Sequence, residues 1–147
     1  MELKLPDSIK YALNKLNECG YEAYAVGGCV RDLLLGIEPH DYDITTSALP
    51  FEIKNVFSNY KIIDTGIKHG TVTIIVEKMP IEITTFRADG EYKDNRHPAK
   101  VKFLSNLESD LMRRDFTINA MAYNDESGLV DAFEGEQDLK KGIIRCV

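Results

Sequence analysis

Apolar side chains near the N-terminus recur at helical spacing. Ile9, Leu13 and Leu16 lie three or four residues apart, and this spacing places them on one face of an α-helix. Gly20 follows the run, and glycine commonly ends a helix. The pattern predicts an amphipathic helix over residues 8–19.

Shorter apolar runs divide the rest of the chain. Strand-like runs, some of them rich in β-branched residues, occupy residues 21–26, 42–46, 61–66, 71–78 and 81–87. Helical patterns occupy residues 29–36, 50–57 and, as one helix or two, 107–124. Met79 and Pro80 predict a turn that joins two of the strands as a hairpin. This order of elements predicts an α/β or α+β domain with a mixed β-sheet flanked by helices.

A polar segment and the end of the chain carry two further predictions. Ala88–Lys100 is polar and contains Gly90 and Pro98, which predicts a long mobile loop of the kind that is often functional. Residues 142–147, GIIRCV, have the pattern of a strand at the chain end. We therefore expect residues 1–147 to be one domain and a fragment of a longer protein.

Composition and charge narrow the class of protein. Of the 147 residues, 44% are hydrophobic and 29% are charged, as in soluble globular domains. The net charge of -6, from 18 basic and 24 acidic residues, does not favour a self-sufficient nucleic-acid binder. Either the substrate is small, or the charge that holds a polymer lies elsewhere.

The cysteines and the N-terminus indicate the compartment. Three cysteines without a CxxC spacing indicate neither a disulfide framework nor a zinc cluster. The N-terminus has no apolar signal core, and no run approaches the roughly 18 apolar residues of a membrane span. These features predict a cytoplasmic protein that makes no membrane contact.

The stretch VGGCVRD combines a strand end, a glycine pair and a helix start. Gly27 and Gly28 would allow a tight turn and a close approach of a ligand to the backbone. Free amides at a helix start attract phosphate, and Arg31, one turn further on, could contact phosphate oxygens in a bidentate manner. A plain glycine turn before a surface helix explains these residues equally well.

Two aspartates lie one residue apart in the next strand-like run. In a strand, Asp41 and Asp43 project to the same face. Two carboxylates at such a short distance repel each other, so they need cations nearby. Hard oxygen ligands suit Mg²⁺, and two metal ions about 4 Å apart could activate a hydroxyl and stabilise a leaving oxygen. A solvated acidic strand end is the alternative interpretation.

Two further groups carry candidate chemistry. Glu82 interrupts an apolar strand, so it is either exposed or directed into a site, and its pattern favours exposure. In RRDFTINA, Arg114 could bind phosphates, Asn119 could bind a sugar or base, and Asp115 would share a face with Asn119 if the segment were helical. A capped helix with a solvated arginine pair, in which Asp115 is the N-cap, is the alternative.

Four motifs in sequence resemble one family. The stretches are GGCVRDLLLG, DYDITTSALP, IEITTFR and DLMRRDFTINAMAY. They are similar, in order and approximate spacing, to the head domain of the bacterial-type (class II) tRNA nucleotidyltransferase and poly(A) polymerase family, a branch of the DNA polymerase beta-like nucleotidyltransferases. The resemblance runs from about Tyr24 to the end of the chain. It implies template-independent transfer of a nucleotide from a triphosphate to an RNA 3′-hydroxyl, with release of pyrophosphate.

The resemblance also implies roles for individual residues. Asp41 and Asp43 match the metal-binding pair of a site with two Mg²⁺ ions, and Glu82 matches a third catalytic carboxylate, against the exposure that its pattern favours. The residues that match the nucleotide-binding positions are Gly27, Gly28, Arg31, Arg114, Asp115 and Asn119. Ala88–Lys100 lies where the family has a flexible loop linked to nucleotide switching.

Several activities share such a head domain. The resemblance implies first a CCA-adding enzyme that uses CTP and ATP on the tRNA 3′ end. Alternatives are a poly(A) polymerase on another RNA, or an enzyme that adds only CC or only A. A nucleotide-binding module without turnover is an alternative of another class. Neck, body and tail domains, which would read the base and hold tRNA, are expected outside residues 1–147.

Overall fold

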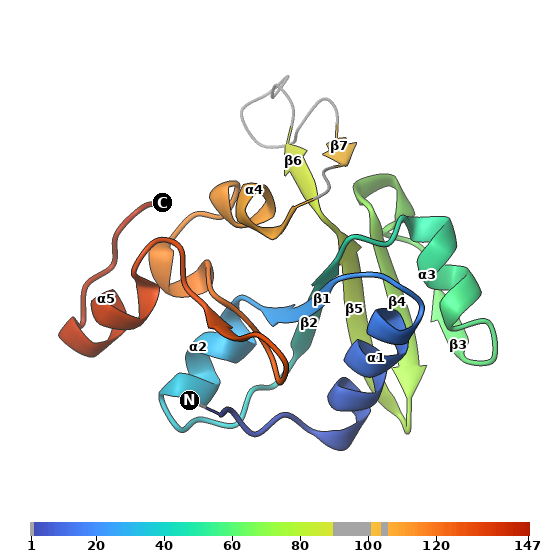
Figure 1. Cartoon of the computed structure of the whole chain (residues 1–147), viewed down its shortest axis with the longest axis horizontal. Helices are drawn as coiled ribbons and strands as arrows, with labels where there is room; N and C mark the ends of the chain where they lie inside the picture. Colours follow the sequence, from blue (N-terminus) through green and yellow to red (C-terminus); the bar gives the residue numbers. More distant parts are fainter. Residues whose placement is uncertain (1, 90–100, 104–105) are drawn as a thin grey trace.

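A mixed β-sheet forms the centre of the computed structural model, which describes residues 2–89, 101–103 and 106–147 (Figure 1). Seven strands of the described residues pair in the order β3-β4-β5-β2-β1-β8-β9, and β6 and β7 form a separate ribbon. The pair β2–β5 is parallel and the other pairs are antiparallel. The mixed sheet flanked by helices confirms the predicted fold class.

The elements have the following bounds. The helices are α1 (Asp7–Glu18), α2 (Gly28–Leu34), α3 (Pro50–Val56), α4 (Leu107–Met112) and α5 (Gly135–Lys141), with 3-10 turns η1 (Ile67–His69) and η2 (Thr117–Asn119). The strands are β1 (Ala23–Val26), β2 (Tyr42–Thr46), β3 (Lys61–Ile63), β4 (Thr71–Val76), β5 (Met79–Thr85), β6 (Arg87–Asp89), β7 (Val101–Phe103), β8 (Ala122–Asn124) and β9 (Gly128–Val130).

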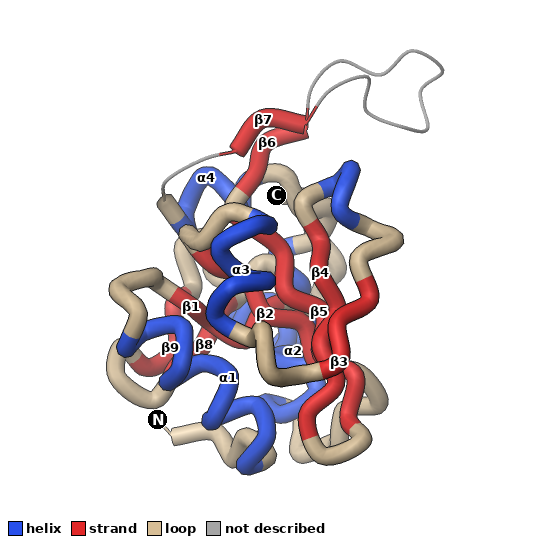
Figure 2. Tube along the Cα trace, turned by 90° about the vertical axis from the view of Figure 1, so that its right-hand side faces the viewer, coloured by secondary structure: helices blue, strands red, loops and turns tan. Residues whose placement is uncertain are grey.

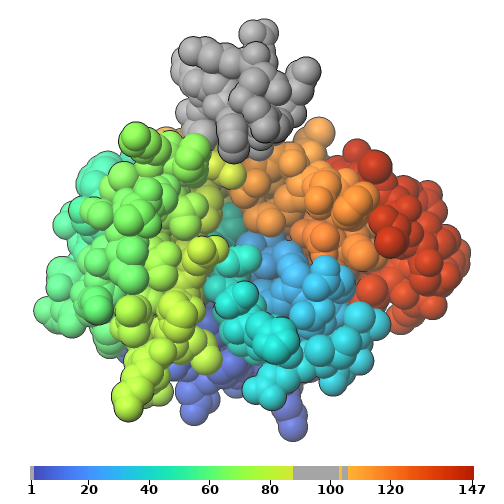
Figure 3. Space-filling view, turned by 180° about the vertical axis from the view of Figure 1, so that it is seen from behind, coloured from blue at the N-terminus to red at the C-terminus, as the bar shows by residue number. Residues whose placement is uncertain are grey.

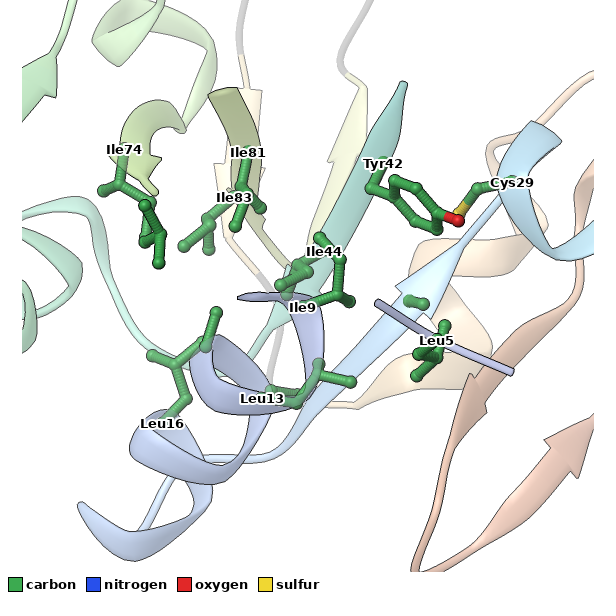
Figure 4. Packing of buried hydrophobic residues seen from close by; sticks show 14 of the residues in the cluster. Leu5, Ile9, Leu13, Leu16, Cys29, Tyr42, Ile44, Ile74, Ile81 and Ile83 are labelled. Atoms are coloured by element: carbon green, nitrogen blue, oxygen red, sulfur yellow. The ribbon is translucent and has the colours of Figure 1, made fainter. Parts of the chain in front are cut away.

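One face of the sheet is buried under α1 and α3 (Figure 2). Ile9, Leu13 and Leu16 of α1, the predicted apolar stripe, are at most 3% exposed. They pack with Ile44 and Ile83 in one cluster (Figure 4). Burying a side chain of this size contributes about 1.5–3 kcal/mol, so this face holds much of the stability of the domain.

The opposite face carries a smaller core. Tyr24 and Val26 of β1 alternate with residues of the first cluster and pack instead against Leu107 and Leu111 of α4. Phe86, directly after β5, completes this second cluster and is fully buried. The second core therefore covers only the part of the sheet around β1, and it fixes α4 beside that strand.

The hairpin turn lies two residues earlier than predicted. Glu77 and Lys78 form the turn with positive φ angles of 49° and 67°, while Met79 and Pro80 begin β5. The type I′ hairpin turn needs positive φ at both central positions, which proline cannot adopt. Proline is tolerated at the second position of β5 because pairing with β2 begins at Ile81.

The predicted helix over residues 107–124 is wrong beyond its first turns. Helix α4 ends at Met112, η2 is a single 3-10 turn, and Ala122–Asn124 is strand β8. Phe116, between them, is extended, with φ -115° and ψ 148°. Tertiary pairing decides the outcome, because Ala122 and Tyr123 complete the sheet beside β1.

Two other predictions need correction. The expected loop at residues 88–100 begins as a strand, because Arg87–Asp89 pairs with Val101–Phe103; its central residues 90–100 lie outside the described residues. The expected strand at residues 142–147 is a single bridge between Cys146 and Phe116. The Thr117 amide donates to the Arg145 carbonyl at 2.9 Å and supports this one contact. None of the helices in the described ranges is long and apolar enough to cross a bilayer.

Candidate functional site

One row of side chains crosses the second face of the sheet. Strand pairing sets Val26 of β1, Asp43 of β2 and Glu82 of β5 side by side. Asp41 directly precedes β2, and strand alternation directs it to the side of Asp43. Figure 3 shows this side hollowed between the yellow-green surface of β5 and the blue surface around α2. The structure thus sets Asp43 and Glu82 side by side, with Asp41 near enough for its charge to act on Asp43.

Burial and repulsion by neighbouring carboxylates shift the pKa of Asp43 within this row. Burial, a hydrogen bond with Glu82 and the charge of that carboxylate raise the pKa of Asp43 to about 6. The charge of Asp41 acts in the same direction, and the Arg114 guanidinium opposes it. Glu82 is itself exposed, as its pattern predicts, yet it lies within reach of Asp43. The carboxylates therefore form a site whose negative charge is only partly compensated.

Hard oxygen donors of this kind suit a divalent cation. The described residues contain no group of three or more His, Cys, Asp or Glu side chains arranged to hold a metal ion. Mg²⁺ commonly takes one or two protein carboxylates and completes its shell with substrate phosphates and water. Asp43, with its raised pKa and neighbouring carboxylates, meets the chemistry of such a donor set.

The glycine turn lies at the end of β1, next to this row. Gly27 has φ 82° and ψ -139°, a conformation that residues with a side chain rarely adopt. A Cβ built on Gly27 would lie 3.5 Å from Nη1 of Arg114. The Gly27 amide donates to the Met121 carbonyl at 3.1 Å, which ties the turn to the segment after η2. Glycine is therefore required here by the backbone conformation, and the Arg114 guanidinium lies at ordinary contact distance from it.

Arg31 covers the second glycine. A Cβ on Gly28 would lie 3.3 Å from Nη2 of Arg31. Nη1 of the same guanidinium donates to Oδ1 of Asn119 at 2.8 Å, and Nε donates to Asp32 at 3.0 Å. The bond to Asn119 joins two predicted site residues from distant parts of the chain. Two guanidinium groups, those of Arg31 and Arg114, therefore lie over one glycine pair.

Asp115 lies apart from these contacts. Its side chain is exposed, and Oδ1 accepts the amide hydrogen of Phe116 at 2.7 Å. The Asp115 carbonyl accepts the Val147 amide at 3.0 Å. Because residues 113–116 are not helical, Asp115 and Asn119 do not share a helix face, and the N-cap of η2 is Phe116 rather than Asp115.

Sequence reasoning missed one buried residue beside the site. Asp110 of α4 is fully buried and accepts a hydrogen bond from Oγ1 of Thr45 at 3.0 Å. It also forms an ion pair with Arg114, four residues further on, at 3.4 Å. The spacing of Asp110 and Arg114 was the available signal, but on a surface helix it indicates only a weak solvated pair.

The fold and this group of side chains define a class of protein. Carboxylates beside guanidinium groups and a glycine turn are the parts that position phosphates and metal ions in phosphoryl-transfer proteins. The mixed sheet that carries them has the nucleotidyltransferase fold, as the solved structures below confirm. The chain belongs to the Poly A polymerase head domain family, whose sequence profile matches residues 23–145.

Relatives of this chain are named CCA-adding enzymes. It is 53% identical over 146 residues to the CCA-adding enzyme of Ligilactobacillus salivarius, covering 97% of this chain and 36% of that enzyme. The Bacillus stearothermophilus CCA-adding enzyme in complex with CTP is 42% identical with a TM-score of 0.84, covering 95% of this chain and 32% of that chain.

A second solved structure contains RNA. The Thermotoga maritima CCA-adding enzyme complexed with tRNA-CCA is 29% identical with a TM-score of 0.75, covering 99% of this chain and 37% of that chain. This chain therefore spans about a third of the length of the relatives that it matches.

Proposed function

We propose that this chain is the catalytic head of a CCA-adding tRNA nucleotidyltransferase. It would transfer CMP and AMP from CTP and ATP to the tRNA 3′ end and release pyrophosphate. The observation that carries the proposal is the row in which Asp43 and Glu82 lie side by side next to the glycine turn. The similarity to enzymes named for CCA addition supports the choice of substrate.

The residues divide into two groups with different tasks. Arg31 and Arg114, over the glycine pair, would bind the triphosphate and offset its charge, and bidentate guanidinium contacts would orient it. Asn119 holds Arg31 and, with Asp115, would contact the nucleotide. Phosphoryl transfer depends on such positioning and electrostatic stabilisation.

The carboxylates form the second group. Asp41 and Asp43 would hold two Mg²⁺ ions, with Glu82 as the third carboxylate. Bound Mg²⁺ would supply Lewis-acid stabilisation of the phosphoryl oxygens and lower the pKa of a bound hydroxyl. The raised pKa of Asp43 reflects burial and the negative charge of its neighbours. This supports the role, because a bound cation would offset that charge and favour the ionised form.

The rest of the protein would hold most of the RNA. We propose that neck, body and tail domains outside residues 1–147 read the base and bind tRNA, which accords with the net charge of -6. Because tRNA is the proposed substrate, we propose the cytoplasm as the location.

Incorporation assays test this function. Full-length protein containing this chain is incubated with Mg²⁺, labelled CTP or ATP, and tRNA that lacks its 3′ end. We expect addition of C, C and A, and loss of nearly all turnover in Asp43→Asn, because the chemistry depends on positioning and electrostatic stabilisation, to which the metal-binding carboxylates contribute. Failure to incorporate either nucleotide while binding both would indicate a nucleotide-binding module instead.

A poly(A) polymerase is the second candidate, because the family description includes that activity. The same assay separates the two. Tailing of unrelated RNA with ATP alone would establish the polymerase, whereas incorporation of CTP into tRNA would exclude it. Addition of only CC, or only A, would identify the narrower enzymes.

A further inference from the structure

A single buried carboxylate connects the site to three other parts of the chain. Asp110 is fully buried, and its two oxygens accept from different partners. Oδ2 accepts from Oγ1 of Thr45 at 3.0 Å and from Nη2 of Arg114 at 3.4 Å. Oδ1 accepts from the Arg87 amide at 2.9 Å and from Nε of Arg113 at 3.3 Å. A buried carboxylate must be compensated in this way, so the contacts fix its position from β2, β6 and the end of α4.

Asp110 faces one end of the Arg114 guanidinium, and the glycine turn faces the other. Nη2 of Arg114 pairs with Asp110, while Nη1 lies 3.5 Å from the position of a Cβ on Gly27. Nε of Arg114 is buried, with no hydrogen-bond partner within the described ranges. Since α4 ends at Met112, the backbone at residue 114 is outside the helix. The Asp110 carboxylate is therefore the hydrogen-bonding contact that sets where this guanidinium lies, while the Asp43 carboxylate attracts it by charge.

We propose that Asp110 is a positioning residue for nucleotide binding. It holds the Arg114 guanidinium over the glycine turn before the triphosphate arrives, so that no ordering of that side chain is needed on binding. Preorganised donors of this kind raise affinity because the entropy of ordering has already been lost on folding. The inference rests on the proposed function, since it takes the ligand to be a nucleoside triphosphate.

A purely structural role for Asp110 must be separated from positioning. Thr45 offers the matched control, because it donates to the same oxygen, is fully buried and does not hold Arg114. Thr45→Val removes that donor while keeping a similar shape, and the Arg87 amide and Nε of Arg113 still hold the Asp110 carboxylate. If Asp110 acts only through stability, Asp110→Asn and Thr45→Val should each weaken nucleotide binding in proportion to their loss of stability.

Equilibrium binding of CTP and of ATP, with Mg²⁺, tests the proposal in the full-length protein containing this chain. The proteins compared are the parent, Asp110→Asn, Arg114→Ala and the double variant. We expect each single variant to bind about tenfold more weakly, the scale of one charge-assisted hydrogen bond. We expect the double variant to lie within about threefold of Arg114→Ala, because residues that act as a unit are not additive. Thr45→Val should stay within about threefold of the parent.

The possible failures have different meanings. Multiplicative losses in the double variant, or an equal loss in Thr45→Val, would overturn the positioning role alone. Normal affinity in Arg114→Ala would overturn it as well, because no guanidinium contact would remain to be positioned. Absence of CTP and ATP binding by the parent would overturn the proposed function together with this inference. If Asp110→Asn lacks a cooperative thermal transition, Asp110→Glu replaces it in the cycle, since it keeps the charge and displaces the oxygens.

Discussion

Asp43 lies in an environment that opposes its own ionisation. Burial and Glu82 raise its pKa from 3.8 to about 6. Because the folded-state pKa exceeds the unfolded value, Asp43 contributes stability below about pH 4, and this contribution is lost as the pH rises through about 6. The shift corresponds to about 3 kcal/mol, and screening of this partly exposed group reduces it to about 1–2 kcal/mol.

We therefore expect Asp43→Asn to stabilise the apo protein at neutral pH. In EDTA at pH 7.5, its free energy of unfolding should exceed that of the parent by about 1–2 kcal/mol, and the gain should vanish below about pH 4. Urea denaturation across this pH range measures the difference. Asp64→Asn, which removes an exposed carboxylate paired with Lys54, should change stability by less than about 1 kcal/mol. A gain that does not depend on pH would refute the electrostatic explanation.

The sequence offered candidate site residues but little on how they are placed relative to one another. Alternation along the strand predicted that Asp41 and Asp43 share a face, and the charge of Asp41 does act on Asp43. The register of β5 against β2, which sets Glu82 beside Asp43, depends on pairing between strands that are distant in the chain. The burial of Asp110 likewise depends on β2 and β6 packing over α4. Local pattern carries no information on either contact.

At the scale of elements, prediction succeeded where the buried positions of a segment follow a single helical or strand periodicity. The apolar stripe of α1 and the strand β2 were predicted at nearly their observed bounds. Residues 107–124 failed because their apolar positions serve α4, η2 and β8 in turn. The hairpin turn was misplaced because its residues, Glu77 and Lys78, are not the glycine or asparagine that such turns favour.

That turn yields a prediction. Lys78 has φ 67°, a conformation that disfavours side chains and suits glycine. Lys78→Gly should therefore raise the free energy of unfolding by about 0.5–1 kcal/mol, or a few degrees in Tm. Calorimetry of the two proteins measures the change. Lys61→Gly, within β3, is the control and should lower stability. A loss in both variants would mean that the backbone at Lys78 is not strained.

At the scale of the whole molecule, the two faces of the sheet have different tasks. One is closed by α1 and α3 and holds the main core. The other is hollowed between the surfaces of β5 and α2 (Figure 3), on the side where strand pairing sets Asp43 beside Glu82. Such a division lets the site carry repelling carboxylates, because the stability of the domain comes from the closed face. The same arrangement leaves the open face able to receive a nucleotide, but the net charge of -6 repels an extended RNA backbone.

This difference between the two faces predicts which ligands residues 1–147 bind without the rest of the full-length protein. Residues 1–147 alone should bind CTP and ATP within about tenfold of the full-length affinity, because the proposed triphosphate contacts lie in this chain. Their affinity for tRNA at about 150 mM salt should be at least about 100-fold weaker, since few phosphates would be neutralised. Titrations of both proteins with each ligand, repeated over a range of salt, measure this. Equal tRNA affinity with an equal salt dependence would show instead that this chain holds the RNA, against the charge argument.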